Sequence, residues 1–428
     1  MKINVLSLFD GMSCGQQALE RAGFKVDKYF ASEIDKYAIQ VTMANYPNTI
    51  QLGSVVNVDG YSLPKIDLLI GGSPCQSFSF AGKRKGMATK CETEILTLEH
   101  YLELKEQGFE FEGQSYLFWE YMRLLNECKP TYFLLENVEM GEKWEKVLSK
   151  AIGVNGIHIN SSLVSAQSRK RIYWTNIGLK PSGLFGDLTS IIKQPKDKGI
   201  LLKDILESEV DEKYFLSEKL IAGFEKHKER HNEKGTGFGY VPKNKDDKGN
   251  SLRANSSLCP TDNMVIVHNT NAIEIKLTSK DKRLQKIVDN NIFIDGDVAH
   301  LDTYNQTIDK NKSPALKLPH NDRFIIAPTE SINVVEIKCG QLGYDKPFEE
   351  NNKAQALLQR DYKGMNNYGI NVASFNSRIR KLTPLEYERL QTVADKYTNH
   401  VSDSQRYKML GNGWTIDVIS HIFSYCKF

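Results

Sequence analysis

Short apolar runs alternate with helix-like segments over the first 135 residues. The run Ile3–Phe9 is followed by Gly11 and Gly15, and then by apolar residues at helical spacing as far as Gly23. This order predicts a strand, a glycine-containing turn and a helix. Further strands are expected at Tyr29–Ile34, Ile66–Ile70 and Tyr132–Leu135, and helices at Tyr37–Ala44 and Leu117–Leu125. Such alternation predicts an α/β fold with a Rossmann-like, doubly wound, mostly parallel sheet.

The pattern changes after about Gly178 and changes back after about residue 374. The intervening segment is rich in Asn, Lys and Asp and contains short β-prone pieces. Helical periodicity returns from Leu382, where Thr383, Pro384 and Glu386 have the spacing of a capping box. We therefore expect a first domain at residues 1–178, a second, β-rich variable domain at 179–374, and a C-terminal segment at 375–428 that packs back on the first domain.

Composition is that of a folded globular protein. Of the 428 residues, 40% are hydrophobic and 25% are charged, and the net charge of +3 means that any strongly basic surface must be local. The seven cysteines are scattered and odd in number, which favours a reducing compartment. No apolar run is long enough for a membrane span. We expect a cytoplasmic protein that is a monomer and has no membrane partner.

The first turn and the second strand carry a candidate cofactor site. An acidic residue, Glu33, follows Gly15 by 18 residues and ends the second predicted strand. A carboxylate at this point can bind both hydroxyl groups of a ribose, while the preceding turn lets backbone approach a ligand closely. The combination favours a nucleoside-containing cofactor. The alternative is a tight turn and an unrelated surface glutamate.

A candidate nucleophile follows the third predicted strand. Cys75 stands at the carboxyl end of this strand, where open α/β sheets bind ligands. A lone cysteine after proline is often inert, so later residues have to decide. Glu136 ends the fourth strand and brings a carboxyl group to the same edge, and the segment Gln167–Arg171 adds guanidinium groups. The alternative for that segment is a solvated basic loop.

These motifs together resemble those of the DNA cytosine-5 methyltransferase family. The resemblance covers about residues 1–178 and 376–428, and the motifs occur in the family's order. They are the Phe9 and Gly11 turn, the acid Glu33, Pro74-Cys75-Gln76, Glu136-Asn137-Val138, Gln167-x-Arg169-x-Arg171, and Gly411-Asn412. The middle region resembles nothing comparable, as the family implies for a target recognition domain that varies with the DNA sequence.

The resemblance implies an enzyme that transfers a methyl group from S-adenosylmethionine to carbon 5 of a flipped-out cytosine in double-stranded DNA. Restriction-modification, phage protection and regulation are the alternative settings. Cys75 would be the nucleophile at carbon 6, Glu136 would hold cytosine nitrogen 3, Arg171 would contact the cytosine carbonyl, and Arg169 would hold Glu136 and a phosphate. Residues implied at the cofactor are Phe9, Asp10, Gly11, Gly15, Glu33, Ile34, Ser54, Val55, Pro74, Asn412 and Trp414. Residues implied at DNA are Gln76, Ser77, Ser79, Lys83, Arg84, Lys85 and Gln167. No metal is implied.

Three departures from the family pattern stand out. Ser54 replaces the usual aspartate after Gly53. Trp414 stands where valine is usual, and a tryptophan at this position is similar to the de novo methyltransferases of animals. An insertion near residues 88–112 has leucines at helical spacing, and we expect it to contact DNA; the alternative is a helical flap packed on the core. The rival functions are a tRNA-modifying enzyme, whose Cys-Phe-Thr signature is absent here, and an idle DNA-binding relative, which would not retain Cys75.

Overall fold

The computed structural model divides the chain into two compact units. The first comprises Met1–Val265 and Lys381–Phe428, and the second Ile266–Arg380. This boundary lies later than the expected domain start at residue 179, because Leu202, Leu252 and Val265 are buried in a core of the first unit. That residues 179–374 act together as one recognition domain stays a prediction. The structure describes residues 2–74, 95–111, 114–182, 187–233, 240–254, 258–268, 298–302, 307–310, 323–326, 335–336, 371–372 and 377–428.

A seven-stranded sheet forms the centre of the first unit, in the order β3-β2-β1-β4-β5-β8-β6. The first five strands in this order pair in parallel with their neighbours. Strand β8 pairs antiparallel with both β5 and β6. The predicted mostly parallel α/β sheet is therefore confirmed. Sequence patterns did not predict β3, β6 or β8. The strands are β1 (Lys2–Leu8), β2 (Lys25–Ser32), β3 (Ile50–Gln51), β4 (Leu68–Gly71), β5 (Tyr132–Val138), β6 (Ile157–Asn160) and β8 (Lys170–Thr175).

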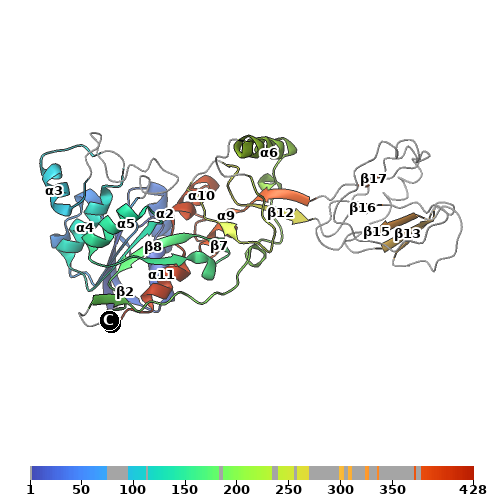
Figure 1. Ribbon diagram of the computed structural model, residues 1–428. Helices are drawn as coiled ribbons and strands as arrows, with labels where there is room; N and C mark the ends of the chain where they lie inside the picture. The colour runs from blue at the N-terminus through green and yellow to red at the C-terminus, as the bar shows by residue number, and fades with distance from the viewer. Residues whose placement is uncertain are drawn as a thin grey trace. The chain divides into compact units, whose positions relative to one another are not determined.

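Helices cover both faces of this sheet (Figure 1). Successive side chains of a strand point to opposite faces, so Ile3 and Val5 of β1 enter one core and Leu6 and Leu8 the other. Helices α1 and α11 pack on the first face, and α4 and α5 on the second. The helices are α1 (Cys14–Arg21), α2 (Lys36–Asn45), α3 (Leu98–Glu106), α4 (Leu117–Cys128), α5 (Glu142–Ile152), α6 (Glu218–Glu233), α9 (Pro384–Leu390), α10 (Asp403–Asn412) and α11 (Ile416–Phe423).

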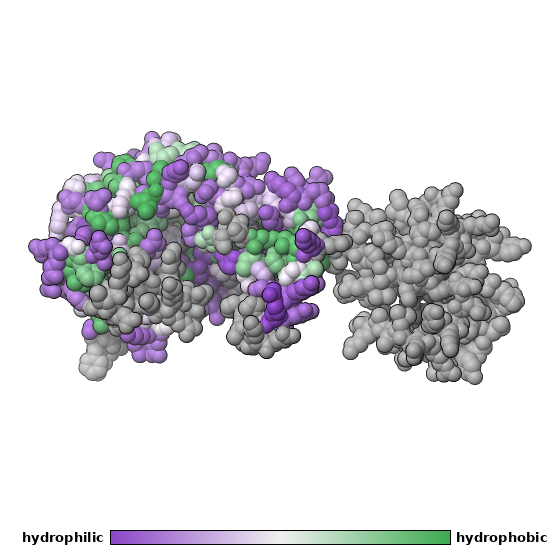
Figure 2. Space-filling model, turned by 90° about the horizontal axis from the view of Figure 1, so that it is seen from above, coloured by the Kyte–Doolittle hydropathy of each residue, from purple (hydrophilic) through white to green (hydrophobic). Residues whose placement is uncertain are grey.

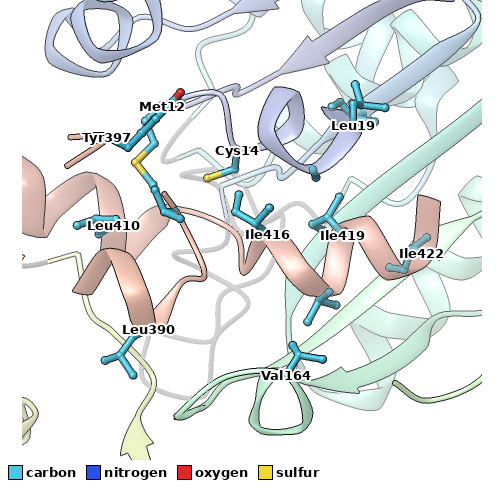
Figure 3. Close-up of a cluster of buried hydrophobic side chains, with 14 of the residues drawn as sticks. Met12, Cys14, Leu19, Val164, Leu390, Tyr397, Leu410, Ile416, Ile419 and Ile422 are labelled. Atoms are coloured by element: carbon cyan, nitrogen blue, oxygen red, sulfur yellow. Dashed lines mark hydrogen bonds between the residues drawn. The ribbon is translucent and has the colours of Figure 1, made fainter. Parts of the chain in front are cut away.

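The C-terminal segment packs back on the first helix, as expected. Ile416, Ile419 and Ile422 recur every three residues along α11 and are fully buried, and Figure 3 shows them beside Cys14 and Leu19 of α1. Each buried isoleucine contributes about 1.5–3 kcal/mol relative to an exposed one. The predicted capping box is also confirmed at the start of α9. The segment Lys381–Phe428 is thus an integral part of the first unit.

The described part of the insertion forms α3, which confirms its helical pattern. Tyr101 is buried, and its hydroxyl donates to Oε1 of Glu120 in α4 at 2.5 Å. Lys105 also contacts Glu120, whose side chain is fully buried. The described part of the insertion therefore packs on the core, as the helical-flap alternative describes. The basic segment that precedes it lies outside the described residues.

The remaining described elements are short. Hydrophilic residues predominate on the face of the first unit seen in Figure 2, where hydrophobic residues form several separate groups. In the described ranges no helix has the length and apolar character needed to cross a membrane. The other strands are β7 (Gln167–Ser168), β9 (Leu179–Ser182), β10 (Asp187–Ser190), β11 (Gly249–Asn250), β12 (Met264–His268), β13 (Val298–Asp302), β14 (Thr307–Lys310), β15 (Arg323–Ile326), β16 (Val335–Glu336), β17 (Asn371–Val372) and β18 (Ser377–Lys381).

Candidate active site

The turn between β1 and α1 has an unusual backbone. Phe9, Gly11 and Ser13 all have φ near +60°, a region that bulky side chains rarely adopt. Such conformations persist only where the surroundings hold them, and they gather at ligand sites. Here Tyr397 from the C-terminal segment donates a hydrogen bond to the Met12 carbonyl at 2.7 Å. The turn is therefore held from outside its own helix and strand.

Glu33 follows β2 and connects this turn to the next one. Its Oε2 accepts the backbone N–H of Gly11 at 2.8 Å, and its Oε1 accepts those of Ile34 and Asp35 at 2.7 and 2.8 Å. Three donors fix the carboxylate in position, and of its roughly four lone-pair sites one, on Oε2, remains for a ligand. The side chain of Ile34 is 73% exposed beside it. A fixed carboxylate next to an exposed apolar side chain suits a ribose attached to a flat base.

One cavity of about 570 Å³ opens at the carboxyl ends of β1, β2, β4 and β5. Strand order reverses at this point of the sheet, because β1 lies between β2 and β4, and α/β folds bind ligands at such reversals. The cavity brings together most of the residues that the sequence suggested: Phe9, Asp10, Gly11, Glu33, Ile34, Ser54, Val55, Pro74, Glu136, Arg169, Arg171, Asn412 and Trp414.

Glu136 lies at the inner end of the cavity in an ion pair. Its Oε1 is 3.0 Å from Nε of Arg171. The antiparallel register explains the contact, since Val138 pairs with Arg171 and Glu136 is two residues away on the same face of β5. Both side chains are mostly buried, at 11% and 14% exposure. The resemblance gave the contact with Glu136 to Arg169, whereas the structure gives this one to Arg171.

Arg169 is buried and holds backbone instead. Its guanidinium donates to the carbonyl oxygens of Leu252, Gly411 and Gly413 at 3.3, 3.1 and 3.0 Å. Charged donors make stronger hydrogen bonds than neutral ones. Arg169 therefore joins three separate segments of the first unit around the cavity. Sequence reasoning could not find this role, because backbone carbonyls leave no signal in the sequence.

Two ionisable groups near the turn are strongly affected by burial. Burial raises the pKa of Asp10 from 3.8 to about 6, against the lowering effect of hydrogen bonds from Ser13 and other hydroxyl groups. Burial also raises the pKa of the Cys14 thiol to about 12. Cys14 is therefore a neutral core residue at physiological pH, and only a thiolate is a strong nucleophile.

Two suggested site residues have other roles in the structure. Gly15 does not line the cavity. A Cβ at this position would lie 2.4 Å from Ile70 Cδ1 and 2.7 Å from the Tyr29 hydroxyl. Glycine therefore permits close packing of α1 on the sheet. Gln167, expected at DNA, is fully buried. Its amide nitrogen donates to the Leu390 carbonyl and its oxygen accepts the N–H of Leu252. Gln167 thus links chain segments in the interior, which corrects its assignment as a DNA contact.

The structure adds residues that the motifs did not single out. Asn137 donates from Nδ2 to the hydroxyl and carbonyl oxygens of Ser73 at 3.1 and 3.3 Å, tying the ends of β4 and β5 together two residues before Cys75. Lys408 of α10 lines the cavity and pairs with Asp35 at 2.7 Å. Asn137 could have been identified as a site residue from its position inside the Glu-Asn-Val motif. No sequence motif marks Lys408.

The suggested nucleophile and DNA loop lie outside the described residues. These are Cys75, Gln76, Ser77, Ser79, Lys83, Arg84 and Lys85. The described chain reaches Pro74, which lines the cavity together with Glu136 and Arg171. Within the described ranges, no group of His, Cys, Asp and Glu side chains is arranged to hold a metal ion.

Comparisons with known proteins agree with one another. A family model described as C-5 cytosine-specific DNA methylase matches residues 3–427. The chain is 27% identical to the orphan methyltransferase M.SPRI of Bacillus phage SPR, over 99% of this chain and 97% of the relative. It is 31% identical to the type II methyltransferase M.NlaX of Neisseria lactamica, over 55% and 70% of the two chains.

Among solved structures, the methyltransferase EhMeth of Entamoeba histolytica has a similar fold. The TM-score is 0.54 at 13% identity, with 99% of this chain and 98% of that chain covered. The Dnmt2 methyltransferase of S. pombe gives a TM-score of 0.52 at 14% identity, with 99% and 97% covered. At these identities the likeness concerns the fold.

Proposed function

Because the chain belongs to the C-5 cytosine-specific DNA methylase family, and is therefore a DNA cytosine-5 methyltransferase that uses S-adenosylmethionine, we propose a specific reaction course and target. The enzyme methylates carbon 5 of a flipped-out cytosine within one sequence of double-stranded DNA. It does so through a covalent bond between Cys75 and carbon 6. The observation that carries this proposal is the Glu136–Arg171 pair in the same cavity as Pro74, the residue before Cys75.

The cavity fits S-adenosylmethionine, which supplies a methyl group on a positively charged sulfur. Glu33 is placed to accept a ribose hydroxyl at Oε2, because three backbone donors hold its carboxylate. Ile34 offers an exposed apolar surface for the adenine ring. We assign the remaining contacts to Phe9, Asp10, Gly11, Ser54, Val55, Pro74, Asn412 and Trp414, all of which line the cavity.

The chain's own groups activate the base. Carbon 5 of cytosine is a weak nucleophile, so a Cys75 thiolate first bonds to carbon 6 and pushes the ring electrons toward carbon 5. The protonated carboxyl group of Glu136 donates its proton to nitrogen 3 and thereby neutralises the negative charge that this addition places on the ring. Arg171 binds the cytosine carbonyl oxygen while it holds Glu136. After methylation a base removes the carbon 5 proton, the Cys75 thiolate leaves as the bond between carbons 5 and 6 becomes double again, and nitrogen 3 returns its proton to Glu136.

DNA binding divides into three functions. Flipping a base out of a duplex costs a few kcal/mol, which contacts to the emptied position can offset. We assign these contacts to Gln76, Ser77 and Ser79, and phosphate contacts to Lys83, Arg84 and Lys85. We assign sequence readout to residues 179–374. The relatives named above support a DNA-modifying role of the restriction-modification or phage type.

The test uses DNA that contains 5-fluorocytosine, since fluorine blocks the release step. With S-adenosylmethionine present, the wild-type enzyme should form a stable covalent complex, and Cys75→Ser should form none. Cys128→Ser is the control, because Cys128 lies in α4 and burial raises the pKa of its thiol to about 11. Bisulfite sequencing of DNA from expressing cells gives the target sequence. A covalent complex with Cys75→Ser would overturn the proposed chemistry.

A further inference from the structure

Trp414 contacts the carboxylate of Glu136 from the C-terminal segment. Its indole Nε1 donates a hydrogen bond to Oε2 at 3.2 Å, while Nε of Arg171 lies 3.0 Å from Oε1. Each oxygen of the carboxylate thus has its own donor, and the donors come from two separate parts of the chain. A protonated carboxyl group has one O–H donor and remaining acceptor capacity, so both donors can stay in place while the O–H of Glu136 binds nitrogen 3 of the base.

Gly72 makes room for this contact. A Cβ at Gly72 would lie 2.9 Å from Nε1 of Trp414 and 3.1 Å from Oε2 of Glu136. Both separations are shorter than ordinary contacts, and the indole is a rigid group that cannot bend away. The end of β4, the end of β5 and the C-terminal segment therefore fit together at one point, which requires a bare backbone at Gly72.

The backbone on either side of Trp414 is firmly held. The Gly413 carbonyl accepts hydrogen bonds from Arg169 at 3.0 Å and from Gln391 at 3.1 Å. The Thr415 hydroxyl donates to Gln391 Oε1 at 2.9 Å and accepts from Ser161 at 2.9 Å. An indole whose neighbours are anchored in this way loses little entropy on making its hydrogen bond.

We propose that Trp414 is a positioning residue that, together with Arg171, fixes the plane of the Glu136 carboxylate for the incoming cytosine. This inference rests on the role of Glu136 in the proposed function. The rival explanation is that Trp414 serves only as a wall of the cofactor site. The two differ in the step they affect, because a positioning residue acts on the methylation rate and a wall acts on cofactor affinity.

The first experiment replaces Trp414 by phenylalanine, which keeps an aromatic ring and removes the N–H donor. With saturating DNA and cofactor, the single-turnover methylation rate of Trp414→Phe should fall five- to twentyfold, while the Kd for S-adenosylmethionine stays within twofold. Trp174→Phe is the matched control, since it removes an indole donor to Ser149 at 2.8 Å in the core and should leave the rate unchanged. A raised Kd with an unchanged saturated rate would overturn the inference.

The second experiment reaches the same contact without altering Trp414 or Glu136. Gly72→Ala places a methyl group between them and should also lower the saturated rate. Gly141→Ala is its control, because Gly141 has φ −65° and nothing lies within 4 Å of its Cβ position. An unchanged rate in Gly72→Ala would contradict the requirement for close approach and count against the inference.

A third comparison separates this inference from the proposed function. Glu136→Gln should itself slow methylation strongly, and adding Trp414→Phe should slow it no further, because the indole acts through the carboxylate. If Glu136→Gln methylates at the full rate, the proposed role of Glu136 fails and the inference fails with it. If Trp414→Phe slows the wild-type enzyme and the Glu136→Gln variant by the same factor, Glu136 keeps its role and only the positioning role of Trp414 is overturned.

Discussion

The hydroxyl of Tyr397 donates a hydrogen bond to the backbone carbonyl of Met12 at 2.7 Å, although the two residues are 385 positions apart in the chain. The bond connects the C-terminal segment to the strained turn that lines the cavity. The first turn and the C-terminal segment therefore build the same cavity, and a change in the C-terminal segment should alter the first turn.

Removing this hydroxyl tests that connection. Tyr397→Phe leaves a buried carbonyl without its donor, which costs about 1–3 kcal/mol, and we expect S-adenosylmethionine affinity to fall three- to tenfold. Tyr407→Phe is the matched control, because the Tyr407 hydroxyl donates to the Leu382 carbonyl at the same distance of 2.7 Å. Both variants should lose stability in urea denaturation, but calorimetric titration should show weaker cofactor binding only for Tyr397→Phe.

Glu33→Gln tests the carboxylate that we assign to the ribose. An amide has one acceptor oxygen, so it cannot accept both the Gly11 N–H and the N–H groups of Ile34 and Asp35 in the arrangement observed. The Kd for S-adenosylmethionine should rise at least tenfold, which is about 1.4 kcal/mol. Calorimetric titration measures it. A Kd within twofold of the wild-type value would remove Glu33 from the site.

Asp10 should make stability depend on pH. Its pKa is about 6 in the folded protein against an ordinary value of 3.8, because burial disfavours the charged form. Between these two pKa values the folded chain holds the proton more tightly than the unfolded chain does. The free energy of unfolding therefore falls as the pH rises through this range. Asp10→Asn should therefore be more stable than the wild type at pH 7 by up to about 3 kcal/mol. Urea denaturation from pH 4 to 8 should show the difference shrinking toward pH 4; parallel profiles would contradict this account.

The second unit should control which sequence is methylated. Base contacts specify a sequence, whereas phosphate contacts only position the protein. Exchanging residues 266–380 for the corresponding unit of another family member should change the methylated site in bisulfite sequencing and keep the chemistry. An exchange beginning at residue 180 would also remove Leu202 and Leu252 from the core, so it should cost stability. A folded, active chimera that still methylates the original site would place readout elsewhere.

Features that depend on local sequence were predictable. The first turn, the helix start at Thr383 and the residues at the strand ends each depend on neighbours a few positions away, and the structure has the capping box as expected. The partner of Arg171 depends on the antiparallel register of β5 and β8, a strand pairing that no local pattern specifies. The partners of Arg169 lie on segments more than 80 residues away in the chain. The interior position of Gln167 depends likewise on segments more than 80 residues distant.

The insertion allows a final prediction, because α3 packs on α4 through a buried carboxylate. Glu120 is fully buried and contacts Tyr101, Lys105 and Arg123. Lys105→Ala removes one of its two cationic partners while Arg123 stays in place, and should lower the free energy of unfolding by about 1–3 kcal/mol. Lys146→Ala is the control, since its pair with Glu142 is exposed and such pairs contribute about 0–1 kcal/mol. If α3 only stabilises the core, DNA affinity measured by fluorescence anisotropy should be unchanged in Lys105→Ala. A tenfold loss of DNA affinity in a stably folded Lys105→Ala variant would show instead that the insertion takes part in DNA binding.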